Sequence, residues 1–304
     1  MAKKNTNKKT VAEIVTQRFI DALEKDSIPW IKPWDDWKSW SRNTGDFYQG
    51  ANLLTTSGGE YITFNQAKAE GIKINKGAKS EMIVKYTEYM RKISKEDFQA
   101  AGYVVTDRVE DHGDFYKIPA RSVKYYNVFN VTECTDAEQK HDHKQPRHEW
   151  DAIEEAERIQ KAYIEKSGLD VQTAGNQPLY SPSGHYIVTG RPEQFKSAAA
   201  YYSTSFHELI HSTQKELNRE TGAAFRGSDG KAKAREELVA EIGAAYLMSY
   251  LGIENGYSIN NSEAYVKSWI SNLKNDPNAI LWAAPKAIEA AELILAAAGV
   301  KVNQ

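Results

Sequence analysis

Cysteine is almost absent from this 304-residue chain, since Cys134 is the only one. A single cysteine excludes an internal disulfide, which is typical of proteins in a reducing compartment, so we expect a cytoplasmic protein. Long hydrophobic runs are absent too. The most apolar stretch, 288–302, contains Glu289 and Glu292 and is too short and too polar to span a bilayer. The first nine residues lack the apolar core of a signal peptide. We therefore expect no membrane partner.

An excess of charge of one sign is also lacking. The chain has 39 Lys and Arg against 41 Asp and Glu, and 41% of its residues are hydrophobic. This balance is typical of a globular protein, and the length favours two domains over one. Residues 1–133 hold 21 Lys and Arg against 18 Asp and Glu, whereas residues 134–304 hold 18 against 23. The first part is therefore the better candidate for contact with a polyanion.

A polar segment divides the chain. Residues 134–149 show no apolar periodicity and are predicted to form a linker. It separates a first domain, 1–133, from a second domain, 150–304, and residues 1–9 are predicted to be a disordered tail. Three histidines of the linker are expected to be solvated rather than bound to a metal: His141, His143 and His148.

Hydrophobic periodicity predicts an α+β protein. In the first domain a capping box at Thr10 and Glu13 begins a helix that ends near Lys25. Three short strands and a short helix complete a small α+β domain: 61–64, 82–86, 122–129 and, for the helix, 67–71. The second domain is predicted to be mainly helical with a small sheet. Its expected helices are 150–167, 194–217, 235–252, 262–275 and 278–297, and its strands are 169–173 and 185–189. Pro285 should kink or split the last helix.

The sequence His207-Glu208-x-x-His211 is the strongest chemical signal in the chain. Residues four apart on a helix lie about 40° apart around its axis, so the two imidazoles face the same side and can hold one zinc ion with Glu208 beside it. Two histidines leave a catalytic zinc site one protein ligand short. A third ligand is therefore expected downstream.

Helix 235–252 supplies the third ligand. Its apolar stripe continues at helical spacing onto Glu237 and Glu241, which places both carboxylates on the face expected to be buried. Buried carboxylates need a cation or a strong donor. We assign Glu237 as the third zinc ligand and Glu241 as the acceptor that orients a ligating imidazole. Glu236 lies about 100° away and is expected to be solvated. The alternative is a surface helix with a charged first turn.

Two functions remain open for this site. In the first, Glu208 is the general base of a peptidase and transfers a proton from the attacking water to the leaving amine. In the second, the zinc is structural and the protein only binds its partners. The first is favoured because a closed structural site does not need Glu208. The strand Tyr186–Val188 is the predicted edge to which a substrate peptide would add.

Aromatic and basic residues crowd one segment of the first domain. Four tryptophans fall within eleven residues, beside Lys32, Lys38 and Arg42: Trp30, Trp34, Trp37 and Trp40. Single-stranded nucleic acid is bound by aromatic rings that stack on bases while cations follow the phosphates. The alternative is that some of these rings close a small core. A second basic edge surrounds Gly77, at Lys73, Lys76 and Lys79.

The motifs of both halves resemble the ArdC family of antirestriction proteins. In the first half the matching runs are Pro29-Trp30-x-Lys32-Pro33-Trp34, Tyr48-x-Gly50-x-Asn52-Leu53-Leu54, Thr63-Phe64-Asn65-Gln66-Ala67, Lys76-Gly77 and Tyr126-Asn127-Val128-Phe129-Asn130-Val131. In the second half they are Phe195, Tyr201-Tyr202, His207-Glu208-Leu209-x-His211-Ser212-Thr213, Leu217-Asn218-Arg219 and Glu236-Glu237-Leu238-Val239-Ala240-Glu241.

This resemblance implies an N-terminal domain that binds single-stranded DNA and a zincin-like metallopeptidase domain with zinc held by His207, His211 and Glu237. Such a protein would protect incoming plasmid or phage DNA from host restriction. An active peptidase would have a protein substrate, such as a restriction or replication component. The residues predicted to contact DNA are Trp30, Lys32, Trp34, Tyr48, Asn52, Phe64, Lys76 and Lys79.

Overall fold

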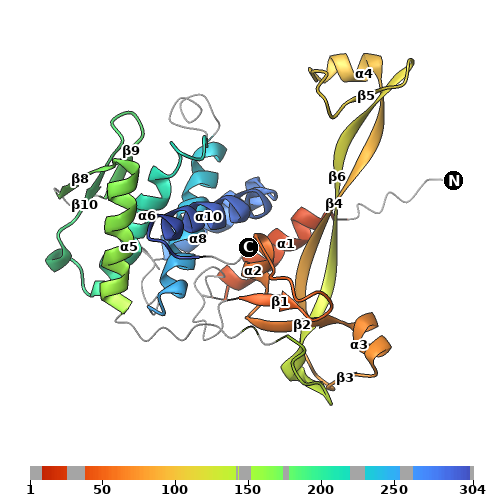
Figure 1. The fold of residues 1–304 in the computed structure, drawn as a ribbon, viewed down its shortest axis with the longest axis horizontal. Helices are drawn as coiled ribbons and strands as arrows, with labels where there is room; N and C mark the ends of the chain where they lie inside the picture. Colours follow the sequence, from red (N-terminus) through yellow and green to blue (C-terminus); the bar gives the residue numbers. More distant parts are fainter. Residues whose placement is uncertain are drawn as a thin grey trace.

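The computed structural model describes residues 9–25, 38–141, 143, 152–173, 178–219, 230–253 and 263–301. The C-terminal half forms a helical body with a small sheet at its side, and the N-terminal half lies against that body. A long two-stranded ribbon projects from the N-terminal half (Figure 1). The prediction of an α+β protein is confirmed. None of the described helices is both long enough and apolar enough to cross a membrane.

A mixed sheet organises the N-terminal half. Its order is β1-β2-β6-β4, and β5 pairs with the outer end of β6. The strands are β1 (Ser39–Ser41), β2 (Gly59–Thr63), β4 (Glu81–Ser94), β5 (Glu110–Asp111) and β6 (Phe115–Asn130). Only the β1–β2 pair of this sheet is parallel among the described strands. The capping box of Thr63 and Gln66 begins α3 (Phe64–Glu70) directly after β2.

The ribbon consists of β4 and β6, which pair in antiparallel register from Glu81 opposite Val128 to Ser94 opposite Phe115. β2 pairs with β6 only at 128–130, and β5 only at 116–117. Between these contacts the ribbon is two strands wide, and every residue of β4 from Lys85 to Lys92 is exposed, so both faces of this outer part meet solvent. The sequence predicted only the inner ends of the two strands, because a ribbon without a covered face lacks the alternation of apolar and polar residues. Helix α4 (Lys95–Ala100) caps the outer end.

The described residues of the C-terminal body include five α-helices. They are α5 (Ala152–Ser167), α6 (Ala198–Ser212), α8 (Lys231–Tyr250), α9 (Glu263–Asn275) and α10 (Ala279–Ala297). α8 packs on both α6 and α10, and α5 packs on α6 and α10. α6 and α8 approach closely at Gly243, where a Cβ atom would lie 2.7 Å from Cδ1 of Ile210. A glycine at this position therefore sets the spacing of the two helices.

A three-stranded sheet flanks α6. β10 (Tyr186–Thr189) is its middle strand, with β8 (Asp170–Thr173) parallel on one side and β9 (Leu179–Ser181) antiparallel on the other. The prediction that Tyr186–Val188 is an edge strand is therefore wrong. β9, which the sequence analysis missed, is an edge and packs against α6. α6 begins at Ala198 rather than at 194, because Ser197 caps it by accepting a hydrogen bond from the Ala200 N–H.

The hydrophobic core is continuous between the two halves. α1 (Val11–Leu23) packs on α9 and α10, and the Thr16 hydroxyl donates to the Pro277 carbonyl at 2.7 Å. α2 (Ala51–Thr55) packs on α10 as well. Gly50, with φ 57°, precedes α2, and a side chain there would lie 3.2 Å from the Pro285 ring. α10 continues through Pro285, so the predicted split is not present.

The first part of the predicted linker is folded against the N-terminal half. η1 (Val131–Glu133) follows β6, and β7 (Cys134–Thr135) pairs with β3 (Lys73–Ile74). The backbone N–H groups of Lys140 and His141 donate to the Glu60 carboxylate. The imidazoles of His141 and His143 bond to backbone carbonyls at 3.0 and 2.8 Å. These two histidines are half-buried, so the prediction that they are solvated is wrong; His148 lies outside the described residues. The assignment of two domains stays a prediction.

Candidate metal centre

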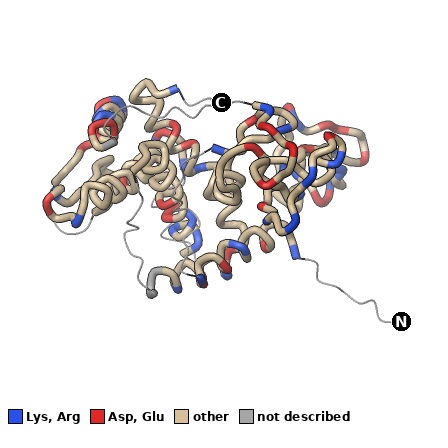
Figure 2. Tube along the Cα trace, turned by 90° about the horizontal axis from the view of Figure 1, so that it is seen from below, with Lys and Arg blue, Asp and Glu red and all other residues tan. Residues whose placement is uncertain are grey.

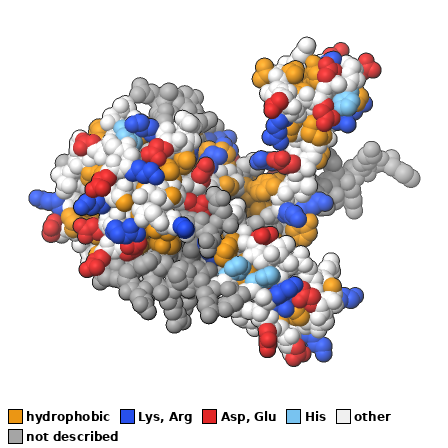
Figure 3. Space-filling view, viewed as in Figure 1, with side chains coloured by type: hydrophobic (Ala, Val, Ile, Leu, Met, Phe, Trp, Pro, Cys, Tyr) orange, Lys and Arg blue, Asp and Glu red, His pale blue; other side chains and the backbone are white. Residues whose placement is uncertain are grey.

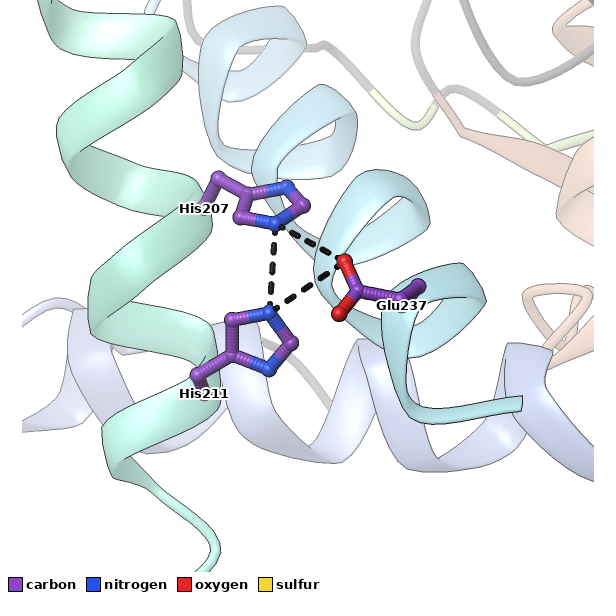
Figure 4. A group of neighbouring side chains, drawn as sticks. All are labelled: His207, His211 and Glu237. Carbon is purple, nitrogen blue, oxygen red and sulfur yellow. Dashed lines mark hydrogen bonds and ion pairs between the residues drawn. The ribbon is translucent and has the colours of Figure 1, made fainter. Parts of the chain in front are cut away.

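The three residues predicted as metal ligands come together between α6 and α8 (Figure 4). The Nε2 atoms of His207 and His211 are 3.1 Å apart, and Oε2 of Glu237 lies 3.5 and 3.7 Å from them. A point about 2.0 Å from all three atoms exists, because that is the radius of the circle through them. Zinc binds histidine nitrogen and carboxylate oxygen at about 2.0 to 2.2 Å. The three side chains therefore fit one divalent cation without rearrangement.

The site is buried on one side and open on the other. The side chains of His207 and His211 are 9% and 11% exposed, whereas that of Glu237 is 40% exposed. Burial alone would raise the pKa of Glu237, but the two imidazoles beside it hold this pKa well below its usual range. Glu237 is thus ionised and borders solvent. A cation held here would have one side accessible to a water or substrate.

Glu208 lies on the same helix with a different environment. It is buried, and burial raises the pKa of its carboxyl group, with Glu237 adding to the rise. The two histidines and the backbone N–H of Tyr180 in β9 oppose the shift. A carboxyl group whose pKa is raised by burial beside a metal site is suited to accept and release a proton. The contact with Tyr180 also connects Glu208 to an edge strand.

Glu236 is the residue that the sequence analysis placed wrongly. It was expected to be solvated, but it is buried behind His211, with Oε1 at 3.4 Å from Nδ1 of the imidazole. Arg219 donates to both carboxylate oxygens of Glu236, and Gln214 donates to Oε1 at 2.9 Å. The expectation failed because α8 packs on both α6 and α10, and the Glu236 side of the helix is covered by Arg219 and Gln214. The run Leu217-Asn218-Arg219 was the sequence signal, noted without a role.

Arg219 also joins α6 to the chain that follows it. Its guanidinium donates to the Ile210 carbonyl at 2.8 Å and to the Thr213 hydroxyl at 2.6 Å. These acceptors lie at the C-terminal end of α6, where carbonyl groups lack partners within the helix. Arg219 therefore ends the metal-site helix and fixes Glu236 with the same side chain.

The electrostatics of the site favour a cation. Burial alone would lower the pKa of His211, but the adjacent carboxylates of Glu236 and Glu237 outweigh it and raise this pKa to about 10. Without a metal, the imidazole would hold a proton at neutral pH. A divalent cation can take the place of that positive charge, because metal binding displaces protons from its ligands.

Glu241 lies beside the other imidazole. Its Oε1 is 3.8 Å from Nδ1 of His207, which is too long for a hydrogen bond. That nitrogen is buried and has no hydrogen-bond partner among the described residues. Glu241 thus lies next to Nδ1 of His207, as helical spacing predicted. The distance between the carboxylate and this nitrogen is too long for a hydrogen bond. Its assignment as the orienting residue stays a prediction.

Five of the residues predicted to contact DNA are described, and Trp30, Lys32 and Trp34 lie outside the described residues. Phe64 is 61% exposed at the start of α3, and Lys76 and Lys79 are exposed in the turn before β4. The other two have structural contacts.

Tyr48 is half-buried, and its ring lies 6.0 Å from that of Tyr61, centroid to centroid. Asn52 bonds to the backbone of Val84 twice, at 2.9 Å as donor and 2.7 Å as acceptor. These bonds hold α2 against β4. These two hydrogen bonds give Asn52 a structural role that does not require contact with DNA.

Charge is distributed over the whole molecule. Lys and Arg alternate with Asp and Glu along the traces of both halves (Figure 2). The small basic excess of the N-terminal half is therefore not concentrated in one stretch of its trace.

Comparisons with known proteins match both halves. Residues 9–129 match the model of the N-terminal domain of anti-restriction factor ArdC, and residues 157–286 match a zincin-like metallopeptidase model. The crystal structure of the antirestriction protein ArdC from plasmid R388 in its metal-free form superposes with a TM-score of 0.65 at 30% identity, covering 95% of this chain and 98% of that one. The Mn(II)-bound form gives 0.64 with the same coverage.

Longer proteins share the same region. Two DNA primases named TraC from Escherichia coli are 31% and 33% identical over 95% of this chain, which spans only 20% and 27% of their lengths. A protein of Sinorhizobium fredii designated y4eC is 26% identical over 93% of this chain and 90% of its own length.

Proposed function

The chain belongs to the ArdC family of antirestriction proteins, and from this we propose that it binds single-stranded DNA of a plasmid or phage and protects that DNA from restriction in the host. The N-terminal half would bind the DNA. Exposed Phe64 and the exposed cations Lys76 and Lys79 support this, because an aromatic ring and cations are what single strands require.

The C-terminal half would hold one divalent cation through His207, His211 and Glu237. The fit of their three ligand atoms to a single point and the Mn(II)-bound form of the R388 protein support a metal site. We propose zinc, because two imidazoles and one carboxylate form a ligand set that catalytic zinc sites use. The bound cation would polarise a peptide carbonyl and lower the pKa of a water next to it.

The observation that carries a catalytic role is the position of Glu208. Its buried carboxyl group interacts electrostatically with all three ligand residues but is not needed to complete their triangle. Glu208 would accept a proton from the attacking water as the new C–O bond forms. It would then donate that proton to the amine nitrogen as the C–N bond breaks, so that protons balance over the cycle.

β9 supplies a place for a substrate peptide. It is an edge of the three-stranded sheet, it packs on α6, and its Tyr180 backbone N–H lies against Glu208. A peptide added as a further strand on β9 would be held by main-chain hydrogen bonds next to the ligand triangle. The substrate would then be an extended protein segment.

A pair of variants tests this role. Glu208→Gln should keep the metal and lose antirestriction in cells challenged with unmodified phage or plasmid DNA. His207→Ala with His211→Ala should lose the metal as well, which metal analysis of the purified protein would report. If Glu208→Gln protects DNA as well as the parent does, the peptidase proposal is wrong and the metal serves structure or binding.

DNA binding is tested separately on the same preparations. A fluorescently labelled single-stranded oligonucleotide should bind with an affinity that falls as salt rises, and duplex DNA of the same sequence should compete poorly. Equal competition by duplex, or no binding by the parent protein, would rule out the single-strand proposal.

A further inference from the structure

The ribbon of β4 and β6 is not used by the metal centre, and its two faces differ in charge. Residues opposite each other in the register share a face. One face carries Ile83, Lys85, Thr87, Tyr89 and Arg91 of β4 and Ile118, Ala120, Ser122, Lys124 and Tyr126 of β6. We name this set the basic ribbon face. It contains no acidic residue over this length.

The opposite face is different in two respects. It includes Glu88, which pairs with Arg121 at 2.8 Å and with Arg108 at 3.4 Å. Its inner end packs into the hydrophobic core through Val84 and Val123. The basic ribbon face is therefore directed away from that packing and is free of compensating carboxylates.

Aromatic and cationic side chains alternate along the basic ribbon face. Tyr126 lies near its inner end, Lys85 and Lys124 face each other one step outward, and Tyr89 and Arg91 follow. The two tyrosines are 40% and 48% exposed. Within the described part of the chain, Lys85, Lys124 and Arg91 form no ion pair. Strand residues rise about 3.3 Å each, so the distance from Tyr126 to Tyr89 is about 20 Å.

A cavity of about 570 Å³ opens at the outer end of this face, which is a size typical of small-molecule sites. Tyr89 and Arg91 line it together with Arg108 and Arg121. The loop after α4 adds apolar surface through Tyr103 and Val104. In the space-filling view the ribbon stands clear of the body, and hydrophobic, basic and acidic side chains are interspersed over its outer end (Figure 3). Arg108 and Arg121 are paired with Glu88, whereas Arg91 forms no ion pair within the described residues. The cavity thus combines the Tyr89 and Tyr103 rings with one uncompensated cation, which suits a flat ring that carries a phosphate beside it.

We propose that the basic ribbon face is a track for single-stranded nucleic acid that ends in the tip cavity, where one base inserts between Tyr89 and the loop after α4. Lys85 and Lys124 would contact the phosphates at the inner part of the track and Arg91 those at the outer part, and the tyrosine rings would stack on bases. A two-stranded ribbon also fits the major groove of duplex DNA, but stacking on exposed rings requires unpaired bases. This inference rests on the proposed function and assigns the site of single-strand binding.

A matched pair of variants tests the track. Tyr89→Ala with Tyr126→Ala removes the two rings of the basic ribbon face. Tyr86→Ala with Tyr125→Ala removes two rings from the opposite face of the same strands, where they are 43% and 44% exposed. With full-length protein, the first pair should weaken binding of a labelled oligonucleotide by about 10- to 100-fold, and the second by less than about 3-fold. Equal losses in both pairs would overturn the proposal.

The salt dependence of binding gives a second test of the cations, because a loss of folding would not change its slope in the predicted way. Replacing Lys85, Lys124 and Arg91 by Ala should reduce the slope of log affinity against log salt by about 2, since each phosphate contact contributes about 0.7 for single strands. Lys92→Ala with Lys117→Ala, on the opposite face, should leave the slope unchanged. If the parent protein binds single strands and the triple variant keeps the parent slope, the track is wrong while the proposed function stands. If the parent does not bind, the proposed function itself fails.

Discussion

Arg219 and Glu236 form a buried ion pair directly behind the metal-site residue His211. Their closest atoms, Nη2 and Oε1, are 2.8 Å apart, and the two side chains are 4% and 5% exposed. The same guanidinium donates to the end of α6, and the same carboxylate meets the His211 imidazole. The same two residues thus stabilise the end of α6 and orient His211, a predicted metal ligand.

Removing one partner of this pair should cost stability. Arg219→Ala leaves Glu236 buried without its strongest donor, and such changes destabilise proteins by about 3 to 5 kcal/mol. Urea unfolding measures the effect. Arg121→Ala is the control, because its pair with Glu88 has the same 2.8 Å separation but exposed side chains; it should change stability by less than about 1 kcal/mol. Similar losses in both variants would mean that burial does not set the energy of the Arg219 pair.

Glu236 should also raise the affinity of the site for its metal. Glu236→Gln preserves the shape of the side chain but weakens its contact with Nδ1 of His211, and loss of such an outer contact lowers metal affinity by about 10- to 100-fold. Competition with a chelator measures the affinity. Glu216→Gln, an exposed position just after α6, is the control and should have no effect. If Glu236→Gln binds the metal as tightly as the parent does, Glu236 stabilises the fold but does not affect metal binding.

Asn52 distinguishes a structural role from a DNA-binding role. Asn52→Ala removes both hydrogen bonds to Val84 and leaves the backbone groups of that residue without these partners, so stability should fall by about 1 to 3 kcal/mol. Affinity for single-stranded DNA should not change. Lys76→Ala with Lys79→Ala should show the reverse, a weaker DNA affinity at unchanged stability. If Asn52→Ala keeps its stability but binds single-stranded DNA more weakly, the prediction that Asn52 contacts DNA is supported.

Glu60 should make part of the free energy of unfolding depend on pH. Burial alone would raise the pKa of its carboxyl group, but donors from Lys140, Arg42 and His141 hold this pKa below its usual value of 4.5. A lowered pKa in the folded state stabilises the protein fully above the unfolded value, and this contribution is lost as pH falls through the folded value. Glu60→Gln should therefore be less stable at pH 7 but lose less stability than the parent below about pH 4.5. Parallel pH profiles of unfolding would contradict this.

The sequence by itself determined the local chemistry of this protein. The four-residue spacing of His207 and His211 places both imidazoles on one side of any helix, and helical periodicity placed Glu237 on the face that turns toward them. Both inferences need only the geometry of a single helix. The motifs of the two halves likewise identified the family, because they depend on order and spacing along the chain.

Tertiary structure decided what surrounds those residues. Glu236 is buried because α6, α10 and Arg219 enclose its side of α8, and a helical wheel of α8 does not include these neighbours. β9 rather than β10 is an edge because strand order depends on which strands pair. The ribbon extends beyond its predicted strands because both faces of its outer part meet solvent, where no burial imposes an apolar pattern. Periodicity tells which residues share a face, but only the packing of distant segments decides what that face meets.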